Sequence, residues 1–106
     1  MSAAANLPDA WPDAVCPRVR KPFRLQWEPA QSAWVLLYPE GMVKLNGSAG
    51  EIMSRCDGER SVAALITELQ TRFQLPDLGN DVRAFLHMAR QQGWVDLTMP
   101  EGGVAA

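Results

Sequence analysis

The stretch MVKLNGSAGEIMSRC (residues 42–56) changes its hydrophobic periodicity from that of a strand to that of a helix. Its first four residues are predicted to form a short strand. Ser48 and Glu51 then show the Ser-x-x-Glu spacing of a capping box, which marks a helix start. Apolar residues follow at intervals of three and four: Ala49, Ile52, Met53 and Cys56. We therefore expect strands before this stretch and helices after it.

Two further strands are predicted on its N-terminal side. FRLQWE (residues 23–28) alternates apolar and polar side chains, which is typical of a half-buried antiparallel strand. AWVLLY (residues 33–38) is almost continuously apolar and indicates a central strand. PEG (residues 39–41) is predicted to be a tight turn. With residues 42–45, these strands form a three-stranded antiparallel sheet.

Two further helices are predicted on the C-terminal side. Ser61 is the expected N-cap of the first, and its apolar stripe consists of Val62, Leu65, Ile66, Leu69 and Phe73. Pro76 ends that helix, and Asp77 or Asn80 is expected to cap the next. The last stripe consists of Val82, Phe85, Leu86 and Ala89, and Gly93 ends it. The predicted fold class is therefore α+β, with the sheet followed by three helices and a short strand at residues 94–97.

The chain of 106 residues has the length of one small domain. Residues 1–22 contain four prolines and are predicted to be a flexible arm. Residues 23–97 are expected to fold, and residues 98–106 are expected to be a disordered tail.

Charge and hydropathy exclude several classes of protein. No apolar run approaches the roughly 20 residues of a membrane span, and no secretory signal is present, so we expect a cytoplasmic protein with two free cysteines. The net charge is −2, and the one basic cluster, PRVRKPFR (residues 17–24), lies in the arm. A winged-helix DNA-binding regulator is therefore the alternative function rather than the leading one.

The run Cys56-Asp57-Gly58 raises the question of a reactive or metal-binding site. A catalytic thiol needs a base within hydrogen-bonding reach, and the single histidine, His87, is predicted on a different helix. Cys56 lies on an apolar stripe, which favours a buried, inert thiol. Zinc-type ligand spacings and a phosphate-binding loop are both absent. We expect no catalytic residue, no metal and no cofactor.

The outer strand at residues 42–45 suggests a different kind of site. Such a strand has unpaired backbone N–H and C=O groups, which an incoming peptide strand can bind. The third helix is the expected second wall of a groove beside that strand.

The run VKLNGSAGEIMSRCDGERSVAALITEL (residues 43–69) resembles the central signature of the PqqD family. The resemblance extends over residues 17–97 and includes Asp81-Val82, Phe85-Leu86 and Gly93-Trp94-Val95. It implies a winged-helix-like fold that acts as a recognition element for ribosomally made, modified peptides. The implied partners are the precursor peptide PqqA and the radical S-adenosylmethionine enzyme PqqE, to which PqqA is presented for crosslinking.

The resemblance also implies a binding mode, in which the peptide lies as an extra strand between the third strand and the third helix. The implied peptide-binding residues are Met42, Val43, Lys44, Leu45, Val82, Arg83, Phe85, Leu86, Ala89 and Arg90. At least half of Leu45, Val82, Phe85 and Leu86 are expected to be mainly structural. The sequence leaves open whether the chain forms a homodimer.

Overall fold

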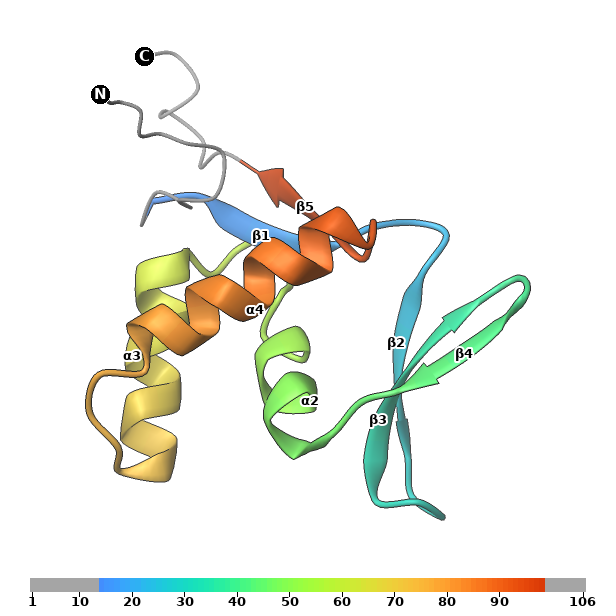
Figure 1. Cartoon of the computed structure of the whole chain (residues 1–106), viewed down its shortest axis with the longest axis horizontal. Coiled ribbons are helices and arrows are strands. Elements are labelled where there is room, and N and C mark those ends of the chain that lie inside the picture. The colour runs from blue at the N-terminus through green and yellow to red at the C-terminus, as the bar shows by residue number, and fades with distance from the viewer. Residues whose placement is uncertain (1–13, 99–106) are drawn as a thin grey trace.

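The computed structural model describes residues 14–98, and its helices lie to one side of a three-stranded sheet (Figure 1). In chain order the elements are β1 (Cys16–Val19), β2 (Arg24–Glu28), β3 (Ala33–Tyr38), β4 (Gly41–Lys44), α2 (Gly47–Met53), α3 (Val62–Phe73), α4 (Gly79–Gln91) and β5 (Val95–Thr98). The α+β class and the order of a three-stranded antiparallel sheet followed by three helices are confirmed, and β1 is a further strand before this sheet. Within the described residues, no helix has the length and apolar character needed to cross a membrane.

The three-stranded sheet has the order β2-β3-β4, with both pairs antiparallel. Leu25 of β2 lies opposite Leu36 of β3, and Val43 of β4 lies opposite the same residue. Because side chains alternate between the two faces of a strand, these three share one face, which packs against the core. Leu36 is fully buried, as expected of a central strand.

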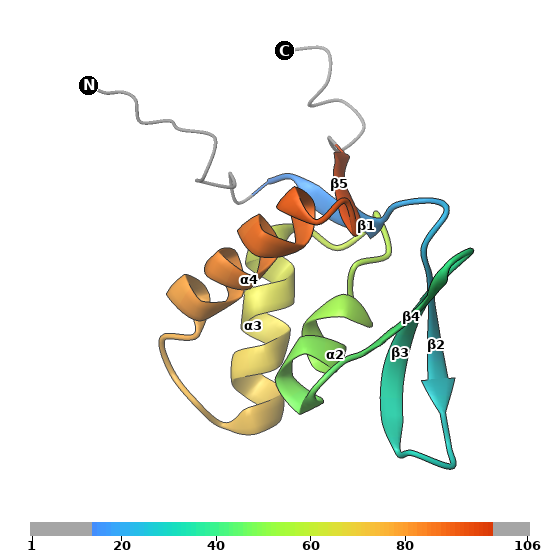
Figure 2. The ribbon, with the colours of Figure 1, turned by 45° about the vertical axis from the view of Figure 1, so that its right-hand side comes forward.

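Helix α2 connects this sheet to the other helices (Figure 2). At Gly50 the helix lies close to the sheet, because a Cβ atom there would lie only 2.7 Å from Cδ1 of Trp34. Since almost no real Cβ contact is that short, glycine lets the helix pack directly on β3. This packing fixes the position of β4, because α2 follows β4 after a short connection.

The predicted capping box at Ser48 and Glu51 is wrong. Asn46 is the N-cap of α2, and its side-chain Oδ1 accepts a hydrogen bond from the Ala49 N–H at 2.8 Å. The Ser48 hydroxyl donates to the same oxygen. The helix also ends earlier than predicted, at Met53, so Cys56 lies in the following connection although it is buried.

The caps of the other two helices agree only in part with the sequence. Ser61 caps α3 as predicted, with its side chain accepting from the Ala64 N–H at 3.1 Å. Neither Asp77 nor Asn80 caps α4, because its N-cap is Leu78, whose N–H donates to the side-chain oxygen of Gln70 on α3. A side chain from another helix therefore satisfies an N–H that local capping was expected to satisfy.

The predicted flexible arm at residues 1–22 is wrong where the structure describes it. Strand β1 pairs antiparallel with β5, placing Val19 opposite Val95. Val15, Cys16 and Pro17 are buried. The proline is tolerated because it contributes its carbonyl, which accepts a hydrogen bond from the Gly58 N–H at 2.9 Å.

The rest of the arm, residues 1–13, and residues 99–106 of the expected tail lie outside the described residues. Residue 98, the first of the expected tail, is the last residue of β5.

Candidate functional site

The Cys56-Asp57-Gly58 run is a structural junction. The Cys56 thiol is buried and donates to the Ile52 carbonyl at 3.4 Å. Burial, together with the adjacent negative charge of Asp57, raises the pKa of Cys56 to about 12, so the thiol stays protonated and unreactive. Among residues 14–98, no three His, Cys, Asp or Glu side chains gather where they could hold a metal ion.

Asp57 closes the turn that Gly58 makes possible with its φ of +82°. Its Oδ1 accepts from the N–H groups of Glu59 and Arg60, each at 2.9 Å. Burial alone would raise the pKa of Asp57, but these two hydrogen bonds and the charge of Arg60 hold it below its ordinary value.

An ion-pair network ties this junction to α2 and α3. Arg60 contacts Asp57 and Glu68, each at 2.7 Å, and Arg55 contacts the other oxygen of Glu68 at 2.9 Å. Glu51 pairs with Arg55 and with Arg72. The hydrogen bonds from Arg60 and Arg55 lower the pKa of Glu68. These charges are matched with one another, which indicates a structural role.

We expect Cys56→Ser to lower the free energy of unfolding by roughly 1 kcal/mol, because a hydroxyl is harder to bury than a thiol. The serine can keep the hydrogen bond to Ile52, which limits the loss. Affinity for a bound peptide should change less than twofold. Urea unfolding and a peptide titration of the same variant measure both quantities, and a fully folded variant without peptide binding would contradict the structural role.

Within residues 14–98, strand β4 has one unpaired backbone edge, and the register identifies which groups it exposes. The Leu45 N–H donates to the Trp34 carbonyl at 3.0 Å, so these two residues form a hydrogen-bonded pair. Bonded and non-bonded pairs alternate along antiparallel strands. Val43, opposite Leu36, therefore points its backbone groups toward β3. Met42 and Lys44 point theirs outward, to the open edge of the sheet.

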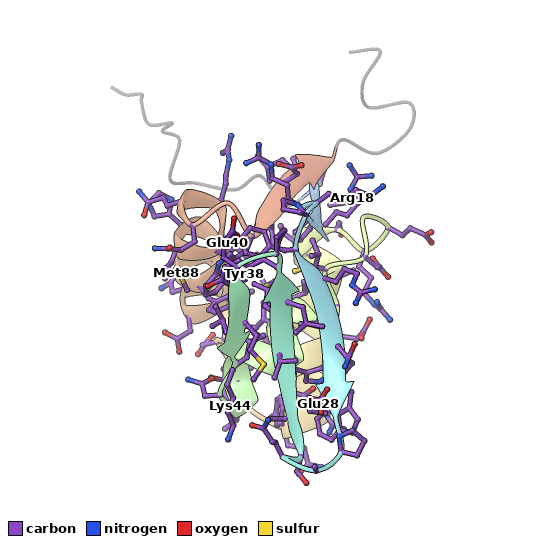
Figure 3. The ribbon with its side chains drawn as sticks, turned by 90° about the vertical axis from the view of Figure 1, so that its right-hand side faces the viewer. Arg18, Glu28, Tyr38, Glu40, Lys44 and Met88 are labelled. Atoms are coloured by element: carbon purple, nitrogen blue, oxygen red, sulfur yellow. The ribbon has the colours of Figure 1, made fainter. Side chains whose placement is uncertain are left out.

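The free edge of β4 lies on the same side of the sheet as α4. In Figure 3, β4 with Lys44 and α4 with Met88 both lie at the left of the view, with α4 behind the sheet, while β2 with Glu28 lies further to the right. The Met42 side chain is 52% exposed, and Val43 packs against the core. Met42 and Lys44 therefore offer a ligand at this edge mainly their backbone.

Helix α4 contributes a wall that is itself anchored in the core. Val82, Leu86 and Ala89 are buried, as is Leu45 next to β4. Phe85 is only partly buried and packs at the margin of the core. Of the predicted apolar site residues on α4, Phe85 is therefore the one that remains accessible to a ligand. The buried side chains of Val82, Leu86 and Ala89 anchor the helix to the core.

Phe85 lines a pocket of about 610 Å³ between α2, the end of α3 and the start of α4. Its apolar lining includes Ile52, Leu69, Phe73, Leu75, Leu78 and Val82, and Glu51 and Asp81 contribute carboxylates. Sequence reasoning missed Asp81 and Met88 as candidate site residues. Helical spacing could have indicated both residues. Asp81 lies four residues before Phe85 and Met88 lies three residues after it, on the same flank of α4.

The structure does not bring Arg83 and Arg90 to that flank. Arg83 extends over Gly79, with an Nη1 atom 2.8 Å from where a Cβ would lie, beside Ile66 of α3. It lines a separate pocket with Gln70 and Asp77. Arg90 is exposed. It lies seven residues, or two helical turns, after Arg83 and therefore on the flank of Arg83 rather than on that of Phe85.

Comparison with known proteins gives a consistent result. A family model described as "Coenzyme PQQ synthesis protein D (PqqD)" matches residues 33–95. A relative from Azotobacter vinelandii, named PqqA binding protein, is 52% identical over 82 residues, which cover 76% of this chain and 89% of the relative. A protein of the same name from Pseudomonas aeruginosa is 54% identical over the same coverage.

A solved structure has a similar fold. It is the solution NMR structure of the PqqD truncation of Methylobacterium extorquens PqqCD, described as a functional, stand-alone recognition element for ribosomally synthesized, modified peptides. The TM-score is 0.66 at 24% sequence identity, and the match covers 84% of this chain and 97% of the other. At that identity the similarity establishes a common fold.

Proposed function

Since this chain belongs to the PqqD family, we propose that it binds the precursor peptide PqqA in pyrroloquinoline quinone biosynthesis. The relatives named for PqqA binding support this proposal, because the alignment covers most of both chains. The observation that carries it is the free edge of β4, with the outward backbone groups of Met42 and Lys44 beside α4.

In the proposed complex the peptide adds a strand to β4. Its backbone exchanges hydrogen bonds with Met42 and Lys44, which gives affinity with little dependence on side chains. Alternate side chains of the peptide then point toward α4 and contact Phe85 and Met88. The two walls, β4 and α4, are supported from the core by Val43, Leu45, Val82, Leu86 and Ala89. Arg83 and Arg90 make no direct contact with the peptide.

The same binding mode suits a carrier that holds the peptide for an enzyme. We assign the chain no catalytic residue of its own, since the Cys56 thiol is buried and protonated and Asp57 serves the turn. The chain then acts in the cytoplasm and presents PqqA to the radical S-adenosylmethionine enzyme PqqE. Because the backbone of the peptide pairs with β4, the alternate side chains that point away from α4 stay free for modification.

A titration with two ligands tests this function. Isotope-labelled protein is mixed with PqqA peptide and, separately, with a 20-base-pair DNA duplex, and amide shifts are followed by NMR. We expect saturable shifts with the peptide at residues 42–45 and on the flank of α4 that carries Phe85. Salt-dependent binding of the duplex without peptide binding would instead support the winged-helix regulator.

A further inference from the structure

Two clusters of cations in this chain differ in how they are neutralised. Arg55, Arg60 and Arg72 are all held in ion pairs at the junction of α2 and α3. Arg18 and Lys21, on β1 and the turn after it, are exposed and make no ion pair within residues 14–98. Arg20 between them has one long contact, 3.7 Å to Asp96. Of these three cations, only Arg20 therefore contacts a carboxylate within residues 14–98.

Two glycines of positive φ lie next to the two arginines of this group, and the contact is close at Gly58. At Gly58, φ is +82°, and a Cβ would lie 3.1 Å from Cδ of Arg18. At Gly93, φ is +78°, and a Cβ would lie 3.7 Å from Nη1 of Arg20. The Arg18 side chain thus packs against the backbone of the turn at Gly58, which limits its freedom and reduces the entropy lost on binding.

The strand that carries them is firmly held. Besides its pairing with β5, the Val19 N–H donates to the Cys56 carbonyl, and the Arg20 N–H donates to the Trp94 carbonyl at 2.7 Å. Arg18, Arg20 and Lys21 line a polar hollow of about 400 Å³ with Asp96. In Figure 3, Arg18 lies on the opposite side of the sheet from Lys44 and Met88.

We propose that Arg18, Arg20 and Lys21 form a docking surface for an acidic patch on a partner protein. Arg18 and Arg20 line the same hollow, and guanidinium groups form bidentate hydrogen bonds with carboxylates. Because this surface and the β4 edge lie on different sides of the sheet, both can be occupied at once. Resting on the proposed function, the partner is the enzyme that receives the peptide, which docks here while PqqA occupies β4.

The test compares two variants with the same change in charge. Arg18→Gln/Lys21→Gln removes two positive charges and leaves the Arg20–Asp96 contact in place. Ala63→Glu/Ala64→Glu adds two negative charges at exposed positions in the first turn of α3, where acidic residues are favoured. Dissociation constants for PqqE and for PqqA peptide are measured by calorimetry in 50 mM and 500 mM NaCl.

For the glutamine variant, we expect affinity for PqqE to fall about fivefold at low salt and most of its salt dependence to disappear. Its affinity for PqqA, and both affinities of the glutamate control, should stay within about twofold of the unaltered chain. Unchanged PqqE affinity, or a loss confined to PqqA, would overturn the docking surface and leave the peptide-binding proposal standing.

Two other outcomes have different meanings. If the unaltered chain binds PqqA but not PqqE, both the docking surface and the handover to the enzyme are wrong. If a DNA duplex binds the unaltered chain and the glutamine variant releases it, the surface takes nucleic acid rather than a protein.

Discussion

Lys44→Pro should weaken peptide binding at least about tenfold while the domain stays folded. The Lys44 N–H points away from β3, so proline removes no hydrogen bond from the sheet itself. It does remove one of the outward groups that the proposed peptide strand needs, and its ring obstructs the approach of the peptide backbone. The loss combines a missing hydrogen bond with a steric clash. Calorimetric titration with PqqA measures it.

Lys44→Ala is the matched control, because it removes the same side chain and keeps the N–H group. Its affinity for PqqA should stay within about threefold of the unaltered chain. Equal, large losses in both variants would show that the lysine side chain binds the peptide. A folded proline variant that binds normally would exclude this edge as the binding site.

Gly50→Ala should lower the free energy of unfolding by about 1–2 kcal/mol. A Cβ at this position meets three atoms near the root of Trp34, at 2.7, 3.2 and 3.2 Å. Since Cβ of Trp34 is fixed to the β3 backbone and its indole packs against the core, α2 and the sheet must separate slightly, and such overpacking costs about 1–3 kcal/mol. The helix propensity of alanine offsets up to about 1 kcal/mol. Urea unfolding monitored by circular dichroism gives the difference.

Gly47→Ala provides the control within the same helix, because nothing lies within 4 Å of a Cβ there. We expect its stability to be unchanged or to rise by up to about 1 kcal/mol. Equal stabilities for the two variants would mean that the close packing of α2 on β3 does not limit residue 50. Peptide affinity should fall only in the Gly50 variant, because β4 moves together with β3.

The parts of the fold that the sequence predicted correctly depend on neighbours along the chain. The alternation in residues 23–28 reflects a strand with one buried face, and the Ser61 cap acts within one turn of its own helix. The errors depend on distant partners. Strand β1 forms because it pairs with β5, about 80 residues away, and Gln70 of α3 bonds the Leu78 N–H that local capping was expected to satisfy. Local periodicity contains no information about such contacts.

The candidate site shows the same limit. The apolar stripe of α4 could be read from spacing, but an amphipathic helix has two polar flanks, and spacing does not tell which of them faces the sheet. The structure turns Arg83 toward α3 and leaves Phe85 on the accessible flank. Likewise, the sequence predicted an edge strand at residues 42–45, but only the pairing of Leu45 with Trp34 identifies Met42 and Lys44 as the outward residues.

Amide hydrogen exchange in the complex tests the central proposal most directly. The same alternation that directs the N–H groups of Met42 and Lys44 outward from β4 directs those of Leu25 and Trp27 outward from β2, at the opposite edge. With saturating PqqA, we predict exchange at Met42 and Lys44 to slow by at least about tenfold, and exchange at Leu25 and Trp27 to stay unchanged. Protection at Leu25 and Trp27, or at neither pair, would contradict a peptide strand added to β4.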